Sequence, residues 1–187
     1  MLIYNPVNRR IPLTLAERLQ RDLRRRLPEV PVTLGATQYS GHARQSASSR
    51  TGSAGRPLIV PVSGDGVYNE VVNGMMDVAG SGALTAVAAG GNANDHRRST
   101  RRMSLVDAVV AAHLGGHARH LDLLRWRIAA MALRATTVGL GPQPRVHRVE
   151  FATVDAVPVQ IDGEIFHLEP ASEIVIESVP QALATVG

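Results

Sequence analysis

Residues 56–74, RPLIVPVSGDGVYNEVVNG, combine a short apolar run, a glycine-rich turn and a helical pattern. The apolar run ends at Val62 and is typical of a buried strand. After the turn, Val67, Val71 and Met75 recur every four residues, as they would on one face of a helix. A strand, a glycine turn and a helix in this order direct backbone N–H groups and the positive end of the helix toward an anion. The stretch therefore predicts an anion site of the phosphate type.

Apolar runs alternate with helical patterns over the first part of the chain. Helices are predicted from the Thr14/Glu17 capping box to Leu27, after the glycine turn, and over 104–114. The Ser-, Gly- and Ala-rich residues 46–55 predict a loop or a poorly formed helix. Strands are predicted over residues 1–4, 30–34, 58–62 and 84–88.

This alternation predicts a parallel sheet with helices on both faces. Ligands of such sheets bind beyond the carboxyl ends of the strands. The polar or glycine residues predicted at those ends are Asn5, Thr37, Gly64 and Gly91.

The pattern changes to β-type runs from about residue 145 onward. These runs are separated by turn residues, and Asp162-Gly163 between two of them is a strong hairpin signal. We therefore expect an α/β domain over residues 1–125 and a reduced, all-β domain over residues 140–187.

Composition excludes several classes of protein. The chain has no cysteine, which rules out a disulfide framework and a thiolate metal site. It has no apolar run of membrane-spanning length and no basic-then-apolar leader, so we expect a cytoplasmic location. His113, His117 and His120 have the spacing of metal ligands, but the intervening Gly115-Gly116 favours a surface location without metal.

Charge is distributed unevenly along the chain. All 20 basic residues are arginines, and they lie before residue 149, whereas residues 149–187 carry only acidic charges. A basic first part is compatible with nucleic acid, an anionic lipid surface, a polyphosphate ligand or a simple solvated surface. The chain lacks aromatic platforms and a recognisable reading helix, so we expect no nucleic-acid partner.

Five sequence blocks occur in the order found in the diacylglycerol kinase catalytic family, which includes bacterial lipid kinases and sphingosine kinases. IYNPVNRR resembles the family's opening strand and Asn-Pro turn, and ATQYSGHA resembles its Thr-x-x-x-Gly-His/Asp-Ala segment. SGDGVYNEVVNGM is similar to its Gly-Gly-Asp-Gly motif, and GGNANDHRR is similar to its Gly-Thr-x-Asn-Asp motif. VPVQIDGEIF resembles the Asp-Gly-Glu turn of its second domain.

The resemblance implies an ATP- and Mg²⁺-dependent kinase that phosphorylates a lipid hydroxyl such as that of diacylglycerol. It implies that Asp65 orients Mg²⁺ or lies near the transferring phosphate, so Asp65 is a candidate both for catalysis and for metal binding. The residues that would line the ATP site are Asn5, Thr37, Ser63, Gly64, Asp65, Gly66, Val67, Asn69, Gly91 and Asn92.

In the second domain the resemblance implies that Asp162 or Glu164 accepts the proton of the lipid hydroxyl. A carboxylate within reach of an alcohol can act in this way. Asp162-Gly163 is also a common hairpin dipeptide, so a purely structural turn stays open as the alternative.

The chain departs from the family pattern in three respects, which are a serine for glycine, two lost threonines and a shortened second domain. Ser63 stands where many members have glycine, as it also does in the sphingosine kinase branch, and Val67 and Asn92 replace threonines. The large β-sandwich that the family carries before the Asp-Gly-Glu turn is represented here by a much shorter segment after Ile128. The shorter segment leaves open a catalytically inactive nucleotide-binding remnant, and the Gly-Asp-Gly turn, which NAD kinases share, leaves open an NAD kinase-like enzyme. The sequence also leaves open a homodimer and a peripheral contact with a membrane.

Overall fold

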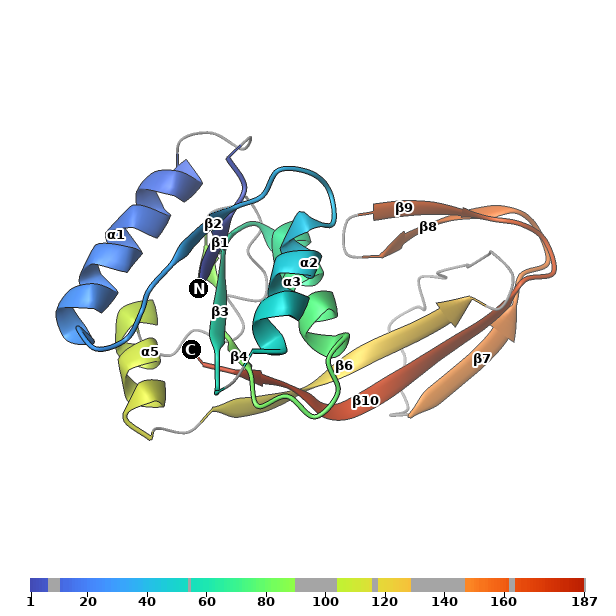
Figure 1. Cartoon of the computed structure of the whole chain (residues 1–187). Helices are drawn as coiled ribbons and strands as arrows, with labels where there is room; N and C mark the ends of the chain where they lie inside the picture. The colour runs from blue at the N-terminus through green and yellow to red at the C-terminus, as the bar shows by residue number, and fades with distance from the viewer. Residues whose placement is uncertain are drawn as a thin grey trace. The chain divides into compact units, whose positions relative to one another are not determined.

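The computed structural model describes residues 1–6, 11–53, 55–89, 104–115, 118–128, 147–161 and 164–186. The chain divides into two compact units, the first formed by Met1–Leu121 with Leu183–Gly187 and the second by Asp122–Ala182. Two strands, β6 (Arg119–Ile128) and β10 (Glu173–Thr185), continue from one unit into the other and are neighbours in one sheet (Figure 1). None of the helices in the described ranges is long and apolar enough to cross a membrane.

The first unit alternates strands and helices, as predicted. Its strands are β1 (Leu2–Tyr4), β2 (Leu34–Ala36), β3 (Leu58–Ser63), β4 (Leu84–Thr85) and β5 (Ala88–Ala89). Its described helices are α1 (Ile11–Arg26), α2 (His42–Thr51), α3 (Asp65–Met76) and α5 (Leu105–His113). The predicted strand over residues 84–88 is present as β4 and β5, both of which pair with β3.

The strands of this unit form a parallel sheet in the order β2-β1-β3-β4, with the end of β10 parallel to β4. The chain passes from β1 to β2 on one side and then returns to place β3 on the other side of β1. This reversal is the topological switch point of a doubly wound sheet, at which ligands commonly bind. The mixed α/β fold with a mostly parallel sheet confirms the predicted fold class.

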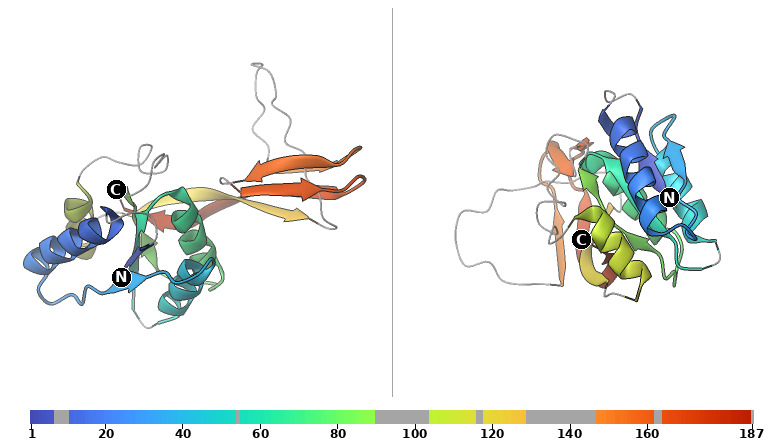
Figure 2. Two further views of the ribbon diagram at one scale, coloured as in Figure 1. Left: turned by 90° about the horizontal axis from the view of Figure 1, so that it is seen from above. Right: turned by 90° about the vertical axis from the view of Figure 1, so that its left-hand side faces the viewer.

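Helices cover both faces of the parallel sheet. Helices α1 and α5 lie on one side of it, and α2 and α3 lie on the other (Figure 1, Figure 2). The predicted apolar face of α1 is buried, with Leu19, Leu23 and Leu27 at most 8% exposed. These leucines share one core with Leu2 and Val60 of the central strands, so burial of apolar surface fixes α1 on the sheet.

Two boundaries differ from the predicted ones. Helix α1 begins at Ile11 rather than at the Thr14 capping box, because Pro12 is accepted in a first helical turn, where its missing N–H is not needed. Strand β2 begins at Leu34 rather than at Val30. The Val32 carbonyl accepts hydrogen bonds from Gln20 (2.8 Å) and Arg24 (3.0 Å) of α1, which holds this segment against the helix.

Residues 46–55 were predicted to form a loop or a poorly formed helix. In the structure most of them belong to the regular helix α2. Ala43 and Ala47 on this helix are fully buried. A Cβ atom added at Gly74 of α3 would lie 2.1 Å from the Arg44 carbonyl oxygen and 3.0 Å from the Ala47 Cβ. The two helix backbones are therefore in direct contact, and this close packing stabilises a helix that has no clear apolar pattern of its own.

The second unit is built from antiparallel strands. Strand β7 (Arg148–Ala152) pairs with β10, and β8 (Val157–Ile161) pairs with β9 (Glu164–Leu168). Ile161 is paired with Glu164, so the two strands pair as the predicted hairpin requires, while the Asp162-Gly163 dipeptide itself lies outside the described residues. The unit has its own small core, made of Val159, Leu168 and Ile174 with neighbouring aromatic and aliphatic side chains.

Candidate functional site at the switch point

Three polar residues meet where β2, β1 and β3 end. Tyr4 is in register with Ala36 on one side and with Val62 on the other, so the residues that follow these positions lie at one edge of the sheet. Asn5, Thr37 and Ser63 are these residues. The backbone N–H of Thr37 donates to the Tyr4 carbonyl oxygen at 2.9 Å, which extends the pairing to the edge itself. The structure thus brings together three predicted site residues from separate parts of the sequence.

The glycine turn joins this edge to α3. Ser63 is the last residue of β3 and is 3% exposed, Gly64 precedes the helix in an extended conformation (φ −83°, ψ −175°), and Asp65 is the first helical residue. The turn therefore places the amino-terminal N–H groups of α3 beside Asn5 and Thr37. A helix start of this kind attracts anions, because these N–H groups have no partner within the helix.

Gly66 has no evident structural reason to be glycine. It lies in the first turn of α3, does not have a positive φ, and is exposed. A Cβ atom added there would meet no atom within 4 Å in the described part of the chain. Because glycine within a helix costs about 0.5–1 kcal/mol relative to alanine, its use here is consistent with open space kept for a ligand that approaches the backbone.

The remaining predicted residues of α3 are half-buried. Asp65, Val67 and Asn69 all have intermediate exposure. Asn73 donates from Nδ2 to the Asn69 carbonyl oxygen at 3.0 Å and also contacts Asn69 Oδ1, so Asn69 is held by its own helix. Burial raises the pKa of Tyr68 above its usual range, because the charged phenolate would be poorly solvated there.

A second loop, between β2 and α2, borders the same edge. Glu70 of α3 accepts the backbone N–H of Gly41 at 2.9 Å and that of Ala43 at 3.1 Å, each through a different carboxylate oxygen. Gly41 has φ +86°, a conformation that favours glycine. The carboxylate therefore fixes the start of α2 against α3. The sequence contained both segments but gave no sign of this contact.

Tyr39 is an aromatic residue of this loop that the sequence analysis did not single out. Its ring stacks on that of His42, with centroids 4.7 Å apart and planes 9° apart. The Tyr39 hydroxyl lies 2.5 Å from Gln45 Oε1, and His42 Nδ1 accepts the N–H of Gln38 at 3.0 Å. Tyr39 is 57% exposed, so a fixed aromatic ring faces solvent a few residues after Thr37.

The structure does not place the other predicted residues at this edge. Gly91, Asn92 and Asp162 are outside the described residues. Glu164 is the first residue of β9, in the second unit, whereas Asp65 belongs to the first. No group of three or more potential metal-binding side chains occurs in the part of the chain that the structure describes. A single carboxylate such as Asp65 at a phosphate site nevertheless suits Mg²⁺, which commonly takes one or two protein carboxylates along with phosphate oxygens and water.

The fold and the turn define a doubly wound α/β protein with a glycine-rich helix start at its switch point. The family model described as "Diacylglycerol kinase catalytic domain" matches residues 1–126. The chain belongs to this family. No curated protein matches it.

Solved structures from Bacillus anthracis str. Sterne show the same fold. One, described as "The crystal structure of a diacylglycerol kinases", is 15% identical with a TM-score of 0.69, and the match covers 99% of this chain and 95% of that one. Another, "A putative diacylglycerol kinase", is 21% identical with a TM-score of 0.53, and the match covers 67% of this chain. That match spans only 43% of the other chain's length.

Proposed function

We propose that the chain is an ATP- and Mg²⁺-dependent lipid kinase of the diacylglycerol kinase type, which transfers the γ-phosphate to a lipid hydroxyl. The family assignment and the similar solved structures support a kinase of the lipid type. The main observation in support of the nucleotide site is Gly66, an exposed glycine at the start of α3. Neither its backbone conformation nor the packing of the described residues explains why this position is glycine.

In this proposal the amino-terminal N–H groups of α3 bind the phosphates of ATP. Gly64 and Gly66 let these oxygens approach the backbone, while Asn5 and Thr37 donate further hydrogen bonds from the neighbouring strand ends. Asp65 would hold Mg²⁺, which neutralises charge on the phosphate oxygens. Because phosphoryl transfer depends mainly on positioning and charge stabilisation, this set of groups is sufficient on the nucleotide side.

On the acceptor side, the lipid hydroxyl oxygen forms a bond to the γ-phosphorus while the bond from that phosphorus to the bridging oxygen of ADP breaks. The hydroxyl proton passes to a carboxylate, for which we propose Glu164 or Asp162. Diacylglycerol and related lipids are the proposed substrates, and contact with a membrane surface would bring them to the protein.

A kinase-inactive nucleotide-binding domain is the second candidate. It is favoured by the short segment between Ile128 and the Asp-Gly-Glu turn, where the family carries a large β-sandwich. An NAD kinase-like enzyme is the third candidate, because NAD kinases share the same glycine turn. The experiment below distinguishes the lipid kinase, the inactive domain and the NAD kinase-like enzyme.

The experiment measures ATP binding and phosphoryl transfer separately. ATP with Mg²⁺ should raise the melting temperature, because a ligand that binds only the folded state stabilises it. Gly64→Val and Gly66→Val should abolish this rise, whereas Gly82→Val, at an exposed loop glycine where an added Cβ atom would make only an ordinary contact with Arg56 Cγ at 3.9 Å, should leave it intact. An unchanged ATP response in folded Gly64→Val and Gly66→Val proteins would mean that the turn is purely structural.

Transfer of labelled γ-phosphate is then followed with diacylglycerol in mixed micelles, a panel of other lipids, and NAD. Asp65→Asn should bind ATP and lose transfer, whereas Glu164→Gln should bind ATP normally and transfer about 10²–10⁴-fold more slowly. Binding of ATP without transfer to any acceptor would reject the kinase and establish the inactive domain. Transfer to NAD alone would establish the NAD kinase-like enzyme.

A further inference from the structure

Strand β9 of the second unit has a free edge. Strands β8 and β9 form a separate two-stranded sheet, and within the residues that the structure describes β9 pairs with no other strand (Figure 1). A free strand edge offers unpaired backbone N–H and C=O groups to another chain, and natural proteins usually protect such edges. An edge without this protection is a candidate interaction surface.

Pro158 indicates which backbone groups of β9 face this edge. It lies in β8 opposite His167, and because proline has no N–H, the two residues cannot exchange a full pair of backbone hydrogen bonds. In an antiparallel ladder, hydrogen-bonded and non-hydrogen-bonded pairs alternate. The backbone groups of Phe166 therefore point toward β8, whereas those of Ile165 and His167 point away from β8, toward the free edge.

Other strands at sheet edges carry protection that β9 lacks. Pro158 removes an N–H from the outer edge of β8, and β2, at the edge of the parallel sheet, is only three residues long. Charged residues occur along β6 (Arg119, Asp122, Arg125 and Arg127) and β7 (Arg148 and Glu150). Strand β9 is five residues long, and its one acidic residue, Glu164, lies at its end. The rest of β9 contains no proline, arginine or acid.

The side chains beside this edge suit contact with another chain. Ile165 is 67% exposed, and His167, on the same face of the hairpin, is also exposed. Phe166 and Leu168 point to the opposite face, where they belong to the small core that includes Val159. The core thus holds the hairpin in place through one face, while an exposed isoleucine marks the other.

The edge of β9 is complementary to itself. In an antiparallel pairing of two copies centred on Phe166, Ile165 of one copy lies opposite His167 of the second copy, and both residues have outward-pointing backbone groups. The same pair recurs on the other side of the two-fold axis. This register also sets Phe166 opposite its own counterpart, a favourable aromatic cross-strand pair. The two Glu164 carboxylates lie at opposite ends of the pairing, so like charges do not meet.

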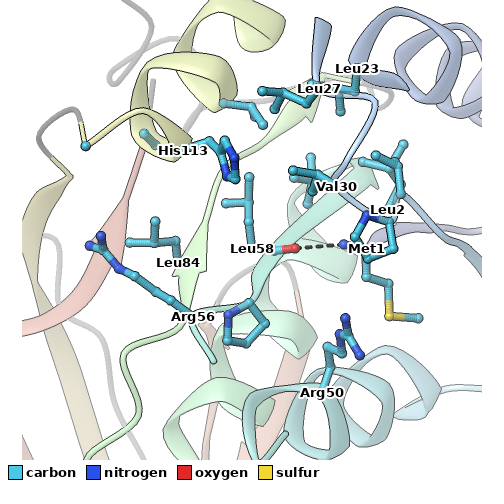
Figure 3. A pocket seen from close by; sticks show the side chains of 17 residues that line it. Met1, Leu2, Leu23, Leu27, Val30, Arg50, Arg56, Leu58, Leu84 and His113 are labelled. Carbon is cyan, nitrogen blue, oxygen red and sulfur yellow. Dashed lines mark hydrogen bonds between the residues drawn. The ribbon is translucent and has the colours of Figure 1, made fainter. Parts of the chain in front are cut away.

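The pocket of the first unit is not suited to such a two-fold contact. Arg50 and Arg56 are exposed at different sides of this pocket, which has a volume of about 400 Å³, and none of its lining residues is acidic (Figure 3). In a two-fold contact the same surface of both copies meets. The arginines of one copy would therefore meet cations of the other, and like charges disfavour association.

We infer that β9 pairs with β9 of a second copy of this chain, which joins the two hairpins into one continuous antiparallel sheet. Each pairing of Ile165 with His167 supplies backbone hydrogen bonds, and the Ile165 side chain becomes covered. Because the contact is short, the dimer is weak and depends on protein concentration. The inference is independent of the proposed kinase function, since the association requires neither nucleotide nor lipid.

Sedimentation equilibrium of the full chain measures the association at protein concentrations from about 1 µM to about 1 mM, which spans weak complexes. We expect a change from monomer to dimer within this range. Ile165→Lys should weaken the dimer by about tenfold or more, because it places two like charges close together on the joined sheet. Val154→Lys introduces the same charge at a position that is 80% exposed and outside β9, and should have no effect. A chain that stays monomeric throughout, or equal dimerisation of the two variants, overturns the inference.

Disulfide cross-linking tests the register, because the chain has no cysteine of its own. A mixture of the single variants Ile165→Cys and His167→Cys should form cross-linked dimers under mild oxidation. Facing residues of such a pair lie about 5.5 Å apart between Cα atoms, within the range of a disulfide. A mixture of Val154→Cys and His167→Cys is the control and should cross-link much more slowly. Equal rates of cross-linking in the two mixtures overturn the inference.

Discussion

Glu70 accepts the backbone N–H of Gly41 at 2.9 Å, so a side chain of α3 holds the residue that precedes α2. Its second carboxylate oxygen accepts the N–H of Ala43 at 3.1 Å. Both donors belong to the start of a helix, where backbone N–H groups need partners from outside the helix. The contact therefore couples the glycine turn, through α3, to the loop that contains Thr37.

Glu70→Gln should lower the free energy of unfolding by about 1.5–3 kcal/mol, because an amide oxygen can replace only one of the two charged acceptors. The measurement is urea denaturation followed by circular dichroism. Glu17→Gln, at an exposed position of α1, is the control and should change stability by less than about 0.5 kcal/mol. Equal stability of the two variants would show that the carboxylate contact contributes little.

Gly74→Ala should destabilise the protein by about 1–3 kcal/mol or more, because the added Cβ would lie 2.1 Å from the Arg44 carbonyl oxygen and force α2 and α3 apart. Gly66→Ala in the same helix should leave the ligand-free protein unchanged or stabilise it by up to about 1 kcal/mol. Thermal and urea unfolding of both variants test this contrast. A loss of stability in Gly66→Ala as large as that in Gly74→Ala would contradict it.

Thr185→Val should stabilise the protein slightly or leave it unchanged. The Thr185 hydroxyl is buried and has no hydrogen-bond partner among the described residues, whereas Thr85, opposite it in the β4–β10 pairing, donates to the Ile59 carbonyl oxygen at 2.9 Å. Thr85→Val should therefore cost about 1 kcal/mol. The measurement is urea denaturation of both variants. A larger loss of stability in Thr185→Val than in Thr85→Val would contradict the prediction.

Asp77→Asn should destabilise the protein near neutral pH, and by less as the pH falls below 3.8. Arg44 donates to both carboxylate oxygens, at 2.7 and 2.8 Å, and these hydrogen bonds lower the pKa of Asp77 from its usual 3.8. A lowered folded-state pKa gives stability that is present above pH 3.8 and is lost as pH falls through the folded pKa. Because both side chains are substantially exposed, the effect should stay below about 1 kcal/mol.

The measurement is the free energy of unfolding as a function of pH for the unchanged chain and for Asp77→Asn. Asp155→Asn, at an exposed position of the second unit, is the matched control and should follow the unchanged chain. A stability difference for Asp77→Asn that is the same at pH 2 and pH 7 would exclude the carboxylate charge as its cause.

Tyr39→Ala should weaken ATP binding about tenfold, if the exposed ring stacks with the adenine base, since such stacking contributes about 1–3 kcal/mol per base. Tyr39→Phe should bind ATP nearly as the unchanged chain does. Inorganic tripolyphosphate, which lacks a base, should bind all three proteins equally. Calorimetric titration measures these affinities, and equal weakening of ATP and tripolyphosphate in Tyr39→Ala would point to a disturbed loop instead of lost stacking.

The sequence by itself determined those features that depend on neighbours close along the chain. Local backbone preferences and hydrogen bonds account for the glycine turn after β3, the Ser104 cap of α5 and the pairing of β8 with the strand that follows it directly, β9. The Ser104 hydroxyl, for example, accepts the N–H of Asp107 at 3.2 Å, as a helix cap does. Continuous apolar runs that alternate with helical patterns also sufficed for the doubly covered parallel sheet, because a continuously apolar strand requires burial on both faces.

Tertiary structure alone decided the features that join distant segments. Helix α2 has little apolar periodicity and exists because Gly74 lets it approach α3, while Glu70 supplies partners for its first N–H groups. The end of β10 returns to pair with β4, which lies far from it in the sequence. Such contacts depend on the shape and distance of partners brought together by folding, and local propensity carries no information about either.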